Sequence, residues 1–177
     1  MCGIAGLIHR GGNAEIGSEM TSMLQALKHR GPDSTGFALY GVPQNGDYML
    51  RFKVAEQEDM AHGFDIHDEV KRRKAEVDLR IQSDGTKIVT EENATEYAFR
   101  YRVQFANGAS EDQTKLKRLA DYIEDIEGAE ILSMGRGLEL VKDLGDAIRV
   151  SDQYQLGTFN GTHAIGHTRM ATESDVD

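Results

Sequence analysis

The chain has 177 residues, of which 39% are hydrophobic and 28% are charged, a composition typical of a folded domain rather than a disordered segment. Its formal net charge of -10, without any block of lysine and arginine, argues against a nucleic-acid-binding or membrane-binding surface. The single cysteine excludes an internal disulfide, and the apolar stretches are too short for a signal-peptide core or a membrane span. We therefore expect a cytoplasmic protein.

The first 41 residues are predicted to form a strand, a helix and a second strand. GIAGLI (3–8) and TGFALYG (35–41) are short apolar runs typical of buried strands. Between them, SEMTSMLQALKHRGPD (18–33) has helical spacing of its apolar residues, with Ser18 as the expected N-cap and Gly31 as part of the stop signal. The predicted buried face of this helix consists of Met20, Met23, Leu24 and Leu27.

The middle of the chain, residues 48–133, is predicted to be a small α+β insertion. EVDLRIQSDGTKIVTEE (76–92) predicts a hairpin that turns at Asp84 and Gly85. YAFRYRVQF (97–105) alternates strictly between apolar and polar residues, as in a half-buried strand, and TKLKRLADYIEDIEG (114–128) predicts an amphipathic helix. Further strands are predicted at YMLRFKV (48–54), AEILSM (129–134) and LELVKDL (138–144).

The only cysteine, Cys2, directly follows the initiator methionine. Removal of Met1 would leave a thiol and a free amine on one residue. Because the reference pKa of an α-amino group is near 7.7–8.0 and that of a thiol near 8.5, the amine can take the thiol proton at neutral pH. The alternative interpretation of Cys2 is an inert structural cysteine.

Three ordered segments, MCGIAGLI (1–8), HRGPDSTGFALYG (29–41) and HAIGHTRMATES (163–174), resemble the signatures of class-II glutamine amidotransferases. Members of this family are N-terminal-nucleophile (Ntn) hydrolases with a four-layer αββα sandwich. The resemblance implies that residues 1–177 are the N-terminal part of one such α+β domain, with the insertion at about 48–133. It covers the two ends of the chain, and the insertion carries none of the family's core motifs.

The resemblance also implies a role for each motif residue. Cys2 would attack the side-chain amide of glutamine and hold a γ-glutamyl thioester. Arg30 and Gly31 would lie against the new N-terminus, with the Gly31 carbonyl orienting the amine. Arg169 would pair with the α-carboxylate of glutamine, assisted by Thr172; a guanidinium fork suits a carboxylate. No cofactor or metal is implied.

Within the family, GRGLELVKDLGD (135–146) together with GTHAIGHTRMATES (161–174) most closely resembles stand-alone amidotransferase subunits of glutamate-synthase-type proteins. These include the first subunit of methylamine–glutamate N-methyltransferase. The resemblance implies that ammonia passes to a separate synthase subunit, and we expect the insertion to serve assembly with that partner. The family's oxyanion-hole Asn-Gly pair follows the GHTR strand, so we expect it beyond Asp177.

Two other functions remain open at this level. One is a catalytically silent interaction or regulatory subunit that keeps the Ntn fold, favoured by the missing oxyanion pair. The other is an Ntn amidohydrolase that acts on a different amide, which the match of Arg169 to an amino-acid carboxylate disfavours. His163 and His167 have the spacing of a metal pair, but with no third ligand nearby in the sequence we do not expect a metal site.

Overall fold

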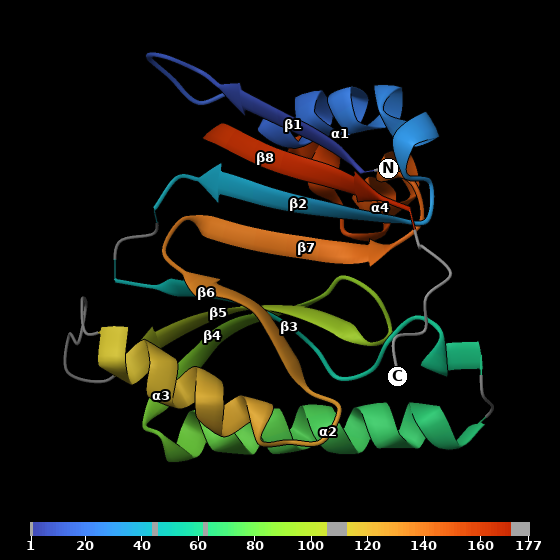
Figure 1. Cartoon of the computed structure of the whole chain (residues 1–177). Coiled ribbons are helices and arrows are strands. Elements are labelled where there is room, and N and C mark those ends of the chain that lie inside the picture. Colours follow the sequence, from blue (N-terminus) through green and yellow to red (C-terminus); the bar gives the residue numbers. More distant parts are fainter. Residues whose placement is uncertain (1, 44–45, 62–63, 106–112, 171–177) are drawn as a thin grey trace. The chain divides into compact units, whose positions relative to one another are not determined.

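The structure is a computed structural model that describes residues 2–43, 46–61, 64–105 and 113–170. Its contacts divide the chain into two compact units: unit 1 combines Met1–Val42 with Leu140–Asp177, and unit 2 is Pro43–Glu139 (Figure 1). The predicted insertion at 48–133 falls inside unit 2. Its role as an insertion into an amidotransferase domain stays a prediction.

Unit 1 is built on a four-stranded sheet with the order β1-β8-β2-β7. Strand β8 pairs antiparallel with both β1 and β2, and β7 enters the unit from the end of unit 2. The elements are β1 (Gly3–Ile8), α1 (Ile16–Ala26), β2 (Ser34–Gly41), β7 (Leu138–Leu144), α4 (Ala147–Gln153) and β8 (Gly161–Arg169), with the 3-10 helices η1 (Lys28–Arg30) and η4 (Leu156–Thr158). The strands predicted in this unit are confirmed, whereas α4 was not predicted.

Helix α1 packs closely on the sheet of unit 1 (Figure 1). A Cβ atom at Gly166 of β8 would lie 2.5 Å from Leu24 Cδ1, so the glycine permits this close approach. The helix begins at Ile16, and Ser18 does not cap it as predicted. The fully buried Ile16 extends the apolar face through Met20 and Leu24 at intervals of four residues, which turns Met23 outward to 38% exposure.

Unit 2 contains a second four-stranded sheet, with the order β4-β5-β3-β6 and antiparallel pairing of its neighbouring strands. The elements are β3 (Tyr48–Lys53), η2 (Asp59–Ala61), α2 (Phe64–Ser83), β4 (Thr86–Asn93), β5 (Ala98–Phe105), α3 (Gln113–Glu124) and β6 (Glu130–Gly135). The alternation predicted for the fifth strand is confirmed. Its buried rings Phe99 and Tyr101 pack against Phe52 of β3, with centroids 5.3 and 5.0 Å apart.

The hairpin predicted at 76–92 is wrong, because its first half belongs to the long helix α2 and only its second half is a strand. Val77 and Ile81 are both fully buried at helical spacing. Tyr101 of the sheet donates its hydroxyl hydrogen to Asp78 Oδ1 at 2.8 Å, which ties the helix to the sheet. Gly85 follows the end of α2 with φ +81, so the predicted turn joins a helix to a strand.

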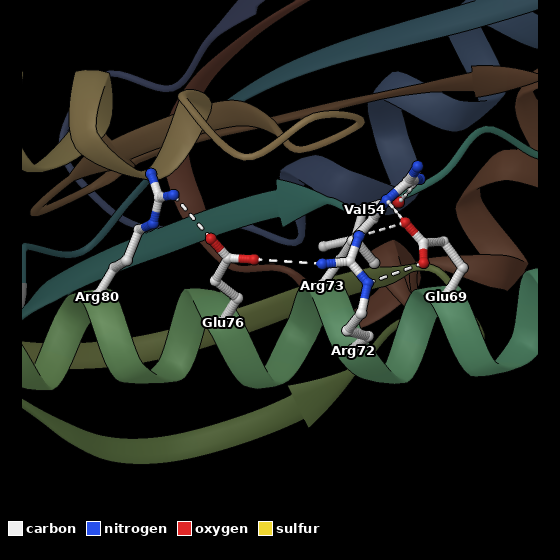
Figure 2. Close-up of polar contacts among 6 residues, drawn as sticks. All are labelled: Val54, Glu69, Arg72, Arg73, Glu76 and Arg80. Carbon is white, nitrogen blue, oxygen red and sulfur yellow. Dashed lines mark hydrogen bonds and ion pairs between the residues drawn. The ribbon is translucent and has the colours of Figure 1, made fainter.

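Alternating charges line α2, as Figure 2 shows. Glu69 accepts hydrogen bonds from Arg72 and Arg73, and Arg73 Nη1 also donates to the Val54 carbonyl at 2.8 Å. Glu76 bridges Arg72 and Arg80 further along the helix. The hydrogen bond from Arg72 is the main cause that lowers the pKa of Glu69 to about 2. These pairs at i,i+3 and i,i+4 support a helix with a largely polar surface.

A buried ion-pair network in unit 2 joins two strands of its sheet to Glu139, the last residue of the unit, which lies at the start of β7. Arg51 Nε donates to Glu139 Oε2 at 2.6 Å, and Arg100 donates to both oxygens of the same carboxylate at 2.7 and 2.9 Å. The side chains of Arg51 and Glu139 are each 4% exposed. Burial alone would raise the pKa of Glu139, but the hydrogen bonds and charges of the two guanidinium groups outweigh it, so the pKa is lowered.

Candidate active site

The pairing of β1 with β8 brings together motif residues from the beginning and the end of the sequence. Gly3 pairs with Thr168 in the antiparallel register, so Cys2 and Arg169 flank this pair at the same end of the two strands. Both are exposed. Residues 167 positions apart in the sequence thus become neighbours because the first strand and the last described strand pair directly.

The turn after α1 reaches the same end of the sheet. Gly31 is buried, and a Cβ atom there would lie 2.6 Å from the carbonyl carbon and 2.7 Å from the nitrogen of Arg169. The Asp33 N–H donates to the Arg169 carbonyl at 3.1 Å, and Ser34 stands opposite Arg169 in the β2–β8 register. Only a residue without a side chain allows the turn to approach the β8 backbone this closely.

Thr168 was not among the predicted site residues, although it lies between Gly3 and the turn. Its side chain is buried, and its hydroxyl donates to the Leu27 carbonyl at 3.4 Å. A Cβ atom at Gly3 would lie 2.9 Å from Thr168 Oγ1. The threonine therefore links the β8 end to the end of α1 and sets how closely β1 approaches. The signal in the sequence was a polar residue on the inward-facing side of an alternating strand.

The structure brings three of the predicted site residues together: Cys2, Gly31 and Arg169. Arg30 directly precedes Gly31 and is exposed in η1. Thr172 lies outside the described residues. The catalytic and binding roles of these residues stay predictions, but the arrangement can place a thiol, a chain terminus and a guanidinium group around one small substrate.

His163 and His167 both lie on the exposed face of β8, but each ring packs against a different residue. The ring of His163 stacks on Tyr40 at 3.9 Å, and its Nδ1 lies 2.9 Å from Thr162 Oγ1. The ring of His167 lies over Gly36, where a Cβ atom would be 2.7 Å from Nε2. Among the residues that the structure describes, no group of three or more His, Cys, Asp or Glu side chains could hold a metal ion.

No protein-family model matches the sequence. A protein of Methanothermobacter thermautotrophicus named "Putative glutamine amidotransferase" is 36% identical over 180 residues, which cover 100% of this chain and 54% of the relative. The Rhizobium meliloti protein named "Glutamine amidotransferase-like protein GlxB" is 31% identical over 179 residues, 99% of this chain and 52% of that relative. The chain is thus similar along its length to proteins named as glutamine amidotransferases.

The chain spans about half the length of the curated relatives it matches. The similarity supports the glutamine amidotransferase family that the motifs predicted. Within the described part of the chain, no helix is both long and apolar enough to cross a membrane.

Proposed function

We propose that this chain carries the glutamine-hydrolysing site of a class-II glutamine amidotransferase, with Cys2 as its nucleophile once Met1 is removed. The observation that carries the proposal is the meeting of Cys2, Gly31 and Arg169 at one end of the β1–β8 pair. The whole-length similarity to proteins named as glutamine amidotransferases supports it.

The proposed reaction uses groups that this chain supplies. The free amine of Cys2 takes the proton of its own thiol, and the thiolate attacks the side-chain carbonyl carbon of glutamine. The tetrahedral intermediate collapses, the carbon–nitrogen bond breaks, and ammonia leaves with the transferred proton. Water then cleaves the γ-glutamyl thioester, which releases glutamate and restores the thiol. Arg169 pairs with the substrate α-carboxylate and fixes the distance between that end and the thiol.

The proposal includes the Ntn four-layer sandwich and a separate synthase subunit that receives the ammonia. Unit 1 combines one sheet with helices packed on it, which are layer types that such a sandwich requires. Unit 2 contains none of the motif residues, so we assign it to assembly with the partner. A docked partner would keep ammonia from escaping into water.

Intact-mass analysis tests the nucleophile directly. The purified protein should lack Met1 and gain one adduct from 6-diazo-5-oxonorleucine, a glutamine analogue that alkylates nucleophiles, and excess glutamine should slow this labelling. In the full-length protein, Cys2→Ala should abolish both labelling and glutamate release while leaving the unfolding transition nearly unchanged, because Cys2 is exposed. Retained Met1, or an adduct that persists in Cys2→Ala, would contradict the proposal. A folded protein that binds a synthase but is never labelled would instead favour the silent regulatory subunit.

A further inference from the structure

The turn that carries Arg30 and Gly31 is held from a second direction, by a segment more than 100 residues away. We call residues 143–146, which comprise the end of β7 and the two residues before α4, the brace turn. The Lys28 ammonium donates to Asp146 Oδ2 at 2.6 Å. The Gly145 N–H donates to the Asp33 carbonyl at 2.8 Å, and the Thr35 hydroxyl donates to the Gly145 carbonyl at 2.8 Å. The brace turn thus contacts both ends of the segment 28–33, which carries Arg30 and Gly31.

The brace turn is itself firmly anchored in unit 1. Asp143 is buried, and its carboxylate accepts hydrogen bonds from the Tyr154 hydroxyl at 2.7 Å and from the Leu144 N–H at 2.8 Å. Gly145 has φ +115, a conformation that side chains disfavour. Asp146 Oδ1 caps α4 by accepting from the Arg149 N–H at 3.0 Å. A contact with this turn is therefore a contact with a fixed part of the unit.

The Asp146 carboxylate joins the turn after α1 to the start of α4, because Oδ2 accepts from Lys28 and Oδ1 accepts from the Arg149 N–H. The hydrogen bond from Lys28, followed by that from the Arg149 N–H, lowers the pKa of Asp146. The carboxylate therefore stays charged at neutral pH. The side chains of Asp146 and Lys28 are 22% and 48% exposed, which limits but does not abolish the strength of the pair.

We propose that Lys28 and Asp146 are positioning residues for the candidate active site, an inference that rests on the proposed function. Their ion pair holds the turn so that Gly31 stays against the Arg169 backbone beside the N-terminal strand. When the pair is broken, the turn opens more often, the amine of Cys2 loses its orienting neighbour, and the thiolate forms less readily at neutral pH.

Two single variants isolate the ion pair. Lys28→Met removes the cation but leaves Asp146 to cap α4, and Asp146→Asn removes the charge but keeps a capping side chain. Lys71→Met is the control, because it also removes a lysine from an ion pair, the more exposed one with Asp68 on α2 of unit 2. The first measurement is hydrogen–deuterium exchange of the Gly145 and Asp33 amides. Exchange should be about two- to fivefold faster in both test variants and unchanged in the control.

The second measurement is the rate of Cys2 alkylation by iodoacetamide from pH 6 to 9, on protein that has lost Met1. Cys2 is the only cysteine of these 177 residues, and peptide mass spectrometry identifies the adduct on its sulfur. Each test variant should react about two- to fivefold more slowly at pH 7, and the difference should vanish at pH 9, where the thiol ionises without help. The double variant should be no slower than the slower single variant, because both substitutions remove one interaction.

The two measurements separate the ways in which the inference can fail. Unchanged exchange in both test variants would overturn the brace, whatever happens at Cys2. Faster exchange with an unchanged pH profile of alkylation would overturn the positioning role. Failure of the proposed function appears instead as retained Met1 or absent labelling by the glutamine analogue, and it leaves the exchange result untouched.

Discussion

Replacing Gly31 by alanine is the sharpest test of how the candidate site is assembled. The added Cβ atom would lie 2.6 to 2.7 Å from backbone atoms of Arg169 and Thr168, which cannot rotate away as a side chain could. Restoring an ordinary contact of 3.4 Å requires the turn and the end of β8 to separate by about 0.8 Å. Overpacking of this kind costs about 1–3 kcal/mol of stability. A displacement close to 1 Å in a reacting site can lower the rate by about 10²-fold.

We therefore expect Gly31→Ala to lower the free energy of unfolding by about 1–3 kcal/mol and the labelling rate of Cys2 by about 10²-fold. Urea denaturation measures the first quantity, and mass spectrometry of the 6-diazo-5-oxonorleucine adduct measures the second under conditions where every variant is folded. The two effects have different physical causes, so they need separate controls.

Two other glycines provide these controls. Gly12 has no atom within 4 Å of its would-be Cβ, so Gly12→Ala should change neither stability nor labelling. Gly17 lies at the start of α1, the end of the helix opposite to the turn with Gly31, and a Cβ atom there would overlap the carbonyl group of Leu156. Gly17→Ala should thus destabilise unit 1 while labelling of Cys2 continues at its normal rate. Normal labelling of Gly31→Ala, or an equal loss in folded Gly17→Ala, would refute the reasoning.

Two further predictions concern the charged networks of unit 2. Glu139→Ala should lower the free energy of unfolding by about 3 kcal/mol in urea denaturation, because Arg51 and Arg100 would lose their shared buried carboxylate. The Glu69 carboxyl should titrate by NMR at a pH of about 2 rather than 4.5, and Arg72→Gln should move that midpoint upward. Since the folded-state pKa is the lower one, the contribution to stability is complete above pH 4.5 and is lost as the pH falls toward 2.

Each of these two predictions can be contradicted by a specific measurement. Glu92 pairs with Arg100 from an exposed position, so Glu92→Ala should cost less than about 1 kcal/mol. Equal losses for Glu92→Ala and Glu139→Ala would show that burial does not decide the strength of this network. For Glu69, a midpoint near 4.5 in the unaltered protein, or one insensitive to Arg72→Gln, would show that the helix ion pairs are not formed in solution.

The strands around the candidate site could be predicted from the sequence, because apolar runs bounded by glycine and polar residues produce a signal within a few positions. The long helix of unit 2 could not. Val77, Leu79 and Ile81 alternate with Asp78 and Arg80, and this alternation imitates a strand. In the structure Leu79 is 65% exposed, whereas Val77 and Ile81 are fully buried. An exposed leucine thus concealed the helical period. The two charged residues that suggested a solvent face instead tie the helix to its neighbours, because Asp78 accepts from the Tyr101 hydroxyl and Arg80 donates to the Tyr122 carbonyl.

Contacts between distant segments form a second class that local patterns do not reveal. Lys28 stands near the end of the predicted helix 18–33, where a positive charge is favourable in any case. Asp146 belongs to a segment for which no helix was predicted. Their ion pair depends on the sheet order, which brings the β7–α4 connection beside the turn after α1. Nothing within several residues of either side chain indicates the other.

Gly31 shows how a correct local prediction can leave out the main role of a residue. The sequence predicted Gly31 as part of a helix stop, and η1 does end at Arg30. The φ angle of Gly31 is -175, an extended conformation that any residue can adopt. If Gly31 only ended the helix, alanine could therefore replace it. The requirement for glycine comes from the backbone of Arg169, a residue 138 positions later in the chain. If the proposed function is correct, that contact makes the spacing between the nucleophile and the carboxylate-binding arginine depend on one missing methyl group, and Gly31→Ala measures this dependence directly.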